Sequence, residues 1–129
     1  MNPLFIDHIL IMVKDLNKTK KFYSKLFGKP IHIAKDSVAW QFGDTKVFFG
    51  LPFKEVENNF FDRNKIGLNH LAWGVRTLDE LKQWKRKLDE IGIANSEILI
   101  DRYGNREYIW FDDPDGIRQE LYFRPEKKE

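Results

Sequence analysis

The stretch that decides the fold is DHILIMVKDLN at residues 7–17, because the chain repeats its pattern as NHLAWGVRTLD at residues 69–79. Each residue of the first stretch lies 62 positions before its partner, so that His8 matches His70 and Val13 matches Val75. Both copies contain an apolar, strand-like run that carries one His, followed by a short polar break. A repeat of this kind indicates that one supersecondary unit is used twice.

An amphipathic helix is predicted after each copy. In the first, Asp15 is the expected N-cap and Gly28 ends the helix. The apolar residues share one face; they are Leu16, Tyr23, Leu26 and Phe27. In the second, Thr77 and Glu80 form a capping box, and Gly92 stops an apolar stripe made of Leu78, Leu81, Trp84, Leu88 and Ile91. Each helix therefore has one face to bury against a sheet.

Three further strands are predicted after each helix. They cover 31–33, 38–42 and 46–51 in the first half, and 97–100, 107–111 and 117–123 in the second. Each half is then a βαβββ module, about 4–51 and 67–123, joined by a linker at 52–66. We expect an α+β fold, a single domain over residues 1–129, in which two paired βαβββ modules, each a curved mixed sheet, form a metal-binding cleft.

Composition excludes several classes of function. The chain has no Cys, so disulfides, thiolate metal sites and cysteine nucleophiles are absent, and any metal must sit on His, Asp or Glu. With 22 basic and 20 acidic residues the net charge of +2 is too balanced for a nucleic-acid footprint. No apolar run approaches the roughly 18 residues that span a bilayer, and no signal peptide is visible, so we expect a cytoplasmic protein.

The two His residues of the repeat suggest a metal site. Alternation places Leu10 and Met12 on the face of His8, and symmetry-related strands would bring His8 and His70 toward one axis. Glu120, in the last predicted strand, offers a third ligand. Two imidazoles and one carboxylate suit Fe(II), Mn(II), Zn(II) or Ni(II) and leave positions open for water or substrate.

A fourth protein ligand is expected to be missing. Aligning Val47 with Ile117 puts Gly50 opposite Glu120, and no acid occurs between Lys46 and Leu51. Asp7 and Asn69 are expected to point away from the His residues that follow them, so that neither supports the site.

These motifs resemble the vicinal oxygen chelate superfamily, which includes glyoxalase I, fosfomycin- and bleomycin-resistance proteins and extradiol dioxygenases. The resemblance runs from about Leu4 to Phe123; it rests on the two His-bearing repeats, on FYSKLFG at 22–28, and on YIWFDDPDG at 108–116 leading into Glu120. It implies paired βαβββ modules and a divalent metal on His8, His70 and Glu120. It also implies a small substrate that chelates the metal through two adjacent oxygens, and a homodimer.

The reaction stays open at this point. Glyoxalase I usually carries an acid on the last strand of its first module, where Phe49 or Gly50 stands here, and the tail beyond Phe123 shows no phosphonate-binding segment. Extradiol dioxygenases need another His, and the spare one, His32, is predicted to be an exposed edge residue. The alternatives are therefore a glyoxalase-like lyase or isomerase, a dioxygenase, or an antibiotic-binding resistance protein. In the enzyme, Glu120 is the candidate catalytic residue.

Substrate-binding candidates come from two places. Arg118 and Tyr122 share the face of Glu120 by alternation. Tyr103 and Arg106 lie in a loop around Gly104 that could close over the cleft, although a solvated loop is the better interpretation of its charges.

Overall fold

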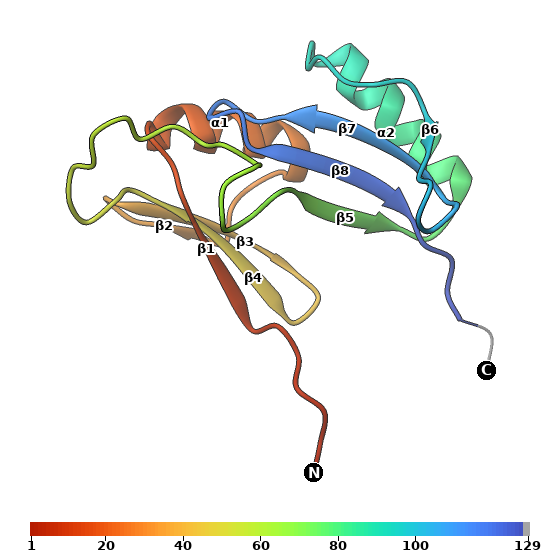
Figure 1. The fold of residues 1–129 in the computed structure, drawn as a ribbon, viewed down its shortest axis with the longest axis horizontal. Coiled ribbons are helices and arrows are strands. Elements are labelled where there is room, and N and C mark those ends of the chain that lie inside the picture. The colour runs from red at the N-terminus through yellow and green to blue at the C-terminus, as the bar shows by residue number, and fades with distance from the viewer. Residues whose placement is uncertain (128–129) are drawn as a thin grey trace. The chain divides into compact units, whose positions relative to one another are not determined.

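The computed structural model describes residues 1–127 and falls into two compact units, Met1–Asn59 and a second that begins at Phe60. Each unit contains one helix and a four-stranded mixed sheet in the order βαβββ (Figure 1). The predicted α+β class and the two βαβββ modules are confirmed, and the boundary between the units lies inside the predicted linker.

The first unit contains β1 (His8–Met12), α1 (Leu16–Phe27), β2 (His32–Ile33), β3 (Ser37–Phe42) and β4 (Thr45–Gly50). Its strands are ordered β1-β4-β3-β2, with β1 parallel to β4 and the other pairs antiparallel. The parallel pair is possible because α1 and two strands separate β1 from β4 along the chain.

The second unit repeats this topology with β5 (Leu71–Val75), α2 (Leu78–Glu90), β6 (Leu99–Ile100), β7 (Glu107–Asp112) and β8 (Arg118–Phe123). The order is β5-β8-β7-β6, again with a parallel pair, β5 and β8, at one edge. The repeat seen in the sequence is therefore a repeat of topology.

Both helices begin where the sequence predicts. The Asp15 side chain accepts a hydrogen bond from the Lys18 amide at 3.1 Å, and the Thr77 hydroxyl accepts one from the Glu80 amide at 3.1 Å. Gly28 follows α1 with a φ of 82°, a backbone conformation that glycine adopts without steric cost.

Each helix buries one face of its own sheet. In the first unit the ring of Tyr23 stacks on Phe49 with centroids 4.2 Å apart, and in the second Leu81 and Leu88 are fully buried with Ile109. Alternation sends the neighbouring side chains of each strand to the opposite face, which that unit's helix does not cover. We call these the open faces of the two sheets; Leu10 and Met12 on the first remain 48% and 40% exposed.

Among residues 1–127, no helix combines the length and hydropathy needed to cross a bilayer.

Candidate metal centre and substrate pocket

The imidazole of His8, the first residue of β1, is held from one side by the residue before it. Its Nδ1 lies 2.7 Å from Oδ2 of Asp7. An ionised carboxylate only accepts hydrogen bonds, so Nδ1 carries the proton and Nε2 presents a lone pair. The expectation that Asp7 points away is wrong, because Asp7 precedes β1 and strand alternation does not govern its side chain.

His70, the residue before β5, has the same arrangement with an amide in place of the carboxylate. Its Nδ1 lies 2.7 Å from Oδ1 of Asn69, whose Nδ2 donates to the carbonyl of Arg63 at 2.8 Å. That second bond fixes the amide orientation, so Oδ1 accepts from the Nδ1–H of His70. The expectation for Asn69 is therefore wrong for the same reason, and Nε2 is again the unprotonated nitrogen.

The Nε2 of His70 faces the carboxylate of Glu120, at 3.6 Å from Oε1. This separation is too long for a good hydrogen bond. Two ligand atoms bound to one divalent ion at about 2.1 Å in tetrahedral geometry lie roughly 3.4 Å apart. The spacing thus fits a pair that shares a cation. Glu120 is the less exposed of the two, at 18% against 41% for His70.

The sheet registers show which residue of the first unit takes the place of Glu120. Ala72 pairs with Glu120, and its counterpart Leu10, 62 positions earlier, pairs with Phe48. The prediction that Gly50 stands opposite Glu120 is therefore wrong by two residues, because the hairpins of the two units differ in length. Its consequence holds, since Phe48 offers no oxygen ligand.

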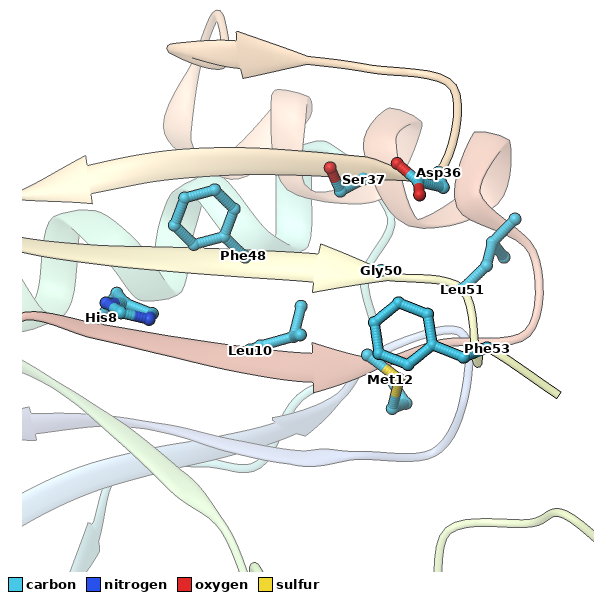
Figure 2. Close-up of a pocket in the computed structure, with 9 residues that line it drawn as sticks. All are labelled: His8, Leu10, Met12, Asp36, Ser37, Phe48, Gly50, Leu51 and Phe53. Carbon is cyan, nitrogen blue, oxygen red and sulfur yellow. The ribbon is translucent and has the colours of Figure 1, made fainter.

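A cavity of about 290 Å³ opens on the first sheet beside His8 (Figure 2). Its lining comes from β1, β4, the start of β3 and the segment after β4; the residues are His8, Leu10, Met12, Asp36, Ser37, Phe48, Gly50, Leu51 and Phe53. The wall is mainly apolar, and His8 contributes an imidazole to it. The cavity can accept a small apolar group next to a potential metal ligand.

His32 is exposed on the edge strand β2, as predicted, but it lies on the same face as His8. Through Ala39 it is in register with Phe48, and its ring contacts Phe48 with centroids 5.7 Å apart. His8 contacts Phe48 at 6.0 Å. The His32 Nε2 lies 3.0 Å from the Ser37 hydroxyl oxygen. Phe48 thus has an imidazole on each side.

Arg118, one of the predicted substrate-binding residues, already has partners within the protein. Its Nε donates to Oδ1 of Asp112 at 2.7 Å, and its guanidinium lies 4.0 Å from the ring centroid of Trp110. The Tyr122 hydroxyl donates to Oδ2 of Asp101 at 2.9 Å.

The loop between β6 and β7 folds onto Tyr122. Asp101 accepts hydrogen bonds from the Gly104 amide and from the Tyr122 hydroxyl, and these lower the pKa of its carboxyl. Burial, together with the bond to Asp101, raises the pKa of Tyr122. A side chain at position 104 would collide with the Tyr122 hydroxyl, so the loop requires glycine there.

Tyr103 and Arg106 both belong to this loop. The Tyr103 ring is 85% exposed with the guanidinium of Arg102 5.0 Å from its centroid, and Arg106 lies 5.8 Å from the ring centroid of Phe123. Neither residue contacts His70 or Glu120 in any recorded hydrogen bond or ion pair within the described chain.

Sequence reasoning missed the hydrogen bonds of Asp7 and Asn69 to the two imidazoles, and it missed the correspondence of Phe48 to Glu120. A signal for the first two was present, because each His of the repeat directly follows a residue with a side-chain carbonyl oxygen. Phe48 gave no such signal, since its correspondence to Glu120 depends on strand register.

Comparison with known proteins identifies the family. The model of the Glyoxalase/Bleomycin resistance protein/Dioxygenase superfamily matches residues 5–121, so the chain belongs to that superfamily, as the motifs suggested. It is similar to metallothiol transferase FosB of Bacillus licheniformis, at 28% identity over 92% of this chain and 75% of the relative. It is also similar to a trivalent organoarsenical cleaving enzyme of Bacillus sp. strain MD1, at 28% identity over 90% of this chain and 71% of the relative.

A solved structure shows the same fold. The lactoylglutathione lyase of Agrobacterium tumefaciens superposes with a TM-score of 0.75 at 17% identity, covering 95% of this chain and 96% of the other.

Proposed function

We propose that this protein is a metal-dependent enzyme in which His8, His70 and Glu120 hold a divalent ion that a small substrate chelates through two adjacent oxygens. The observation that carries the proposal is the pairing of His70 Nε2 with Glu120 Oε1 at 3.6 Å, while Asn69 holds the opposite ring nitrogen. His8 has the same tautomer for the same reason. Imidazoles that bind a metal through one ring nitrogen typically donate the N–H of the other to a carboxylate, carbonyl or water oxygen.

The set needs a residue from each unit. Among the described residues, no group of three or more His, Asp or Glu side chains lies together as a metal site. The second unit alone supplies two ligands, and His8 is the residue of the first unit that repeats His70. A three-ligand set suits Fe, Mn, Ni or Zn and leaves open positions, and the bound ion would act as a Lewis acid.

The chain's own residues limit the reaction. Phe48 stands where the repeat would place a second carboxylate, so within the proposed set Glu120 would both ligate the ion and move a proton. A trivalent arsenic centre prefers sulfur ligands, and the chain has no Cys. We therefore favour a glyoxalase-like lyase or isomerase, or a dioxygenase, over cleavage of an arsenical.

The alternative is an antibiotic-resistance protein of the bleomycin- or fosfomycin-resistance kind, and its metal-free form is a binding protein like the bleomycin-resistance proteins. The apolar cavity beside His8 favours it, because such a cavity could sequester an antibiotic without chemistry. The two candidate functions differ in whether the protein needs a bound metal ion in order to bind its ligand.

A homodimer is part of the proposal, since the superfamily resemblance implies one. Sedimentation at micromolar concentration checks it, and a single monomeric species would count against it. The cytoplasmic location stays a prediction.

Isothermal titration with Mn(II), Ni(II) and Zn(II), and with Fe(II) under anaerobic conditions, tests the site. The native chain should bind one ion, and His8→Ala and His70→Ala should each weaken binding by about ten-fold or more. His32→Ala is the matched control, because it removes an exposed imidazole outside the set. Unchanged affinity in both site variants would refute the assignment.

A further inference from the structure

We propose that the cavity on the first sheet binds an uncharged, flat, apolar group of the substrate, of about the size of one aromatic ring. This inference rests on the proposed function, because it assigns the part of the substrate that does not touch the metal. It also makes Gly50 and Phe48 the residues that determine specificity.

The lining sets the charge of the group. Leu10, Met12 and Phe48 form apolar walls, and neither Lys nor Arg is among the residues around the cavity. Apart from the imidazole, the one ionisable side chain there is the carboxylate of Asp36. A phosphonate or carboxylate on the substrate would lose hydration without gaining a cationic partner.

Phe48 links the cavity to His8, the proposed metal ligand of the first unit. Phe48 is the register counterpart of Glu120, and its ring forms a T-shaped pair with the imidazole of His8, with centroids 6.0 Å apart. Where a fourth ligand would stand, the first unit therefore offers an aromatic surface. A ring attached to the chelating oxygens could pack against Phe48 by edge or offset contacts.

Gly50 keeps the other end of the cavity open. A Cβ at this position would lie 3.2 Å from Cδ1 of Leu10 and 3.5 Å from Cε of Met12. Any larger side chain would occupy space between these two residues. The second unit has Tyr122 at the corresponding register position, opposite Gly74, so the two units differ in the room they leave.

The size of the cavity limits the ligand. At about 290 Å³ it lies at the lower end of the range of small-molecule sites, enough for a single ring. Leu10 and Met12 are half-exposed and Phe53 is 91% exposed, so a ligand in the cavity would remove apolar surface from water. Figure 2 shows these side chains along the cavity, with His8 at the end away from Phe53.

The test compares two probes with the same chelating group, benzohydroxamate and acetohydroxamate, which differ in a phenyl and a methyl group. Titrated into the metal-loaded protein, benzohydroxamate should bind about ten-fold more tightly or better, because the phenyl buries more apolar surface. Gly50→Val should remove most of this advantage and leave acetohydroxamate affinity within about two-fold. Leu10→Ala should reduce it in the same direction, and Ile31→Ala, an exposed apolar residue outside the cavity, should not.

The outcomes separate the two proposals. Equal affinity for the two hydroxamates, both dependent on metal, would overturn the cavity assignment and leave the metal site intact. An advantage for benzohydroxamate that Gly50→Val and Leu10→Ala leave unchanged would also overturn it. Benzohydroxamate binding of equal strength with and without metal, and sensitive to Gly50→Val, would support the cavity and refute the proposed enzyme in favour of sequestration.

Discussion

The two units have one topology but different open faces. Each places a His at the start of its first strand, with Nδ1 bonded at 2.7 Å to the preceding residue. In the second unit the strand opposite carries Glu120, and in the first it carries Phe48. The duplicated scaffold therefore carries different residues at equivalent positions.

The difference extends to the surroundings. Two residues after Glu120 on the same strand, Tyr122 belongs to a polar network in which Asp101 accepts hydrogen bonds from the Tyr122 hydroxyl and from the Gly104 amide. The first unit has an apolar cavity bordered by Leu10 and Phe48. The open face of the second sheet is therefore charged and polar, whereas the open face of the first is mainly apolar.

The largest change in metal affinity is expected from removing the negative charge of Glu120, which the first unit lacks at the equivalent position. Glu120→Gln keeps the shape and the hydrogen-bonding ability of the side chain but loses one negative charge. Metal affinity should fall by about ten-fold or more, while the metal-free melting temperature should change little. Thermal midpoints of both proteins with and without metal check this; a metal-induced shift of equal size in the two would remove Glu120 from the site.

Giving the first unit the carboxylate of the second should make the two faces alike. Phe48→Glu places an acid in the register of Glu120 next to His8, so metal affinity should rise by up to about ten-fold. Benzohydroxamate should bind less well, because the aromatic wall and an open coordination position are both lost. Titration calorimetry measures both, with Phe48→Leu as the uncharged control. Weaker metal binding in Phe48→Glu than in Phe48→Leu would show that this position does not face the ion.

Asp7 and Asn69 bond to the Nδ1 atoms of the two imidazoles. Exchanging their side-chain types should change metal affinity by a smaller factor, downward in the first unit and upward in the second. Asp7→Asn keeps a side-chain acceptor but loses charge, and should weaken metal binding by at most about ten-fold because Asp7 is exposed. Asn69→Asp adds charge behind His70 and should strengthen binding by a similar or smaller factor, although it loses the bond to Arg63.

Nitrogen-15 NMR of the metal-free protein reports the tautomer directly. Both His residues should carry the proton on Nδ1 in the native chain, and Asp7→Ala should mix the tautomers of His8 alone. If Asp7→Ala leaves the tautomer of His8 unchanged, Asp7 does not position the imidazole.

The smallest effect concerns the polar network of the second unit. The lowered pKa of Asp101 contributes stability above the ordinary Asp value near 3.9, and that stability is lost as the pH falls through the lower folded value. Tyr122→Phe removes one donor to Asp101 and raises its folded pKa. The acid limb of the melting temperature, measured from pH 2 to 6, should therefore move to slightly higher pH. Tyr103→Phe is the control, and a limb that moves equally in both variants would contradict this account.

Much of the fold could be predicted from the sequence because its signals are local. Alternation and helical periodicity gave the strands and helices, Asp15 and Thr77 marked where the helices begin, and the 62-residue offset between His8 and His70 gave the duplication. The candidate ligands His8 and His70 were also found in this way, because they occupy the same place in the repeat, and Glu120 was found as an acid in the last predicted strand.

Partners across strands depended on the tertiary structure. The sequence alignment placed Gly50 opposite Glu120, whereas the strand registers place Phe48 there, two residues earlier. Spacing along the chain does not reveal this difference, because strand register is set by packing and turn geometry. The hydrogen bonds of Asp7 and Asn69 likewise depend on side-chain torsions just before each strand, and the order His8, Phe48, His32 across the first sheet depends on strand pairing. The sequence by itself determined which elements form and which residues could bind a metal. The tertiary structure decided what stands beside them, because side-chain neighbours across a sheet are set by contacts between residues far apart in the chain.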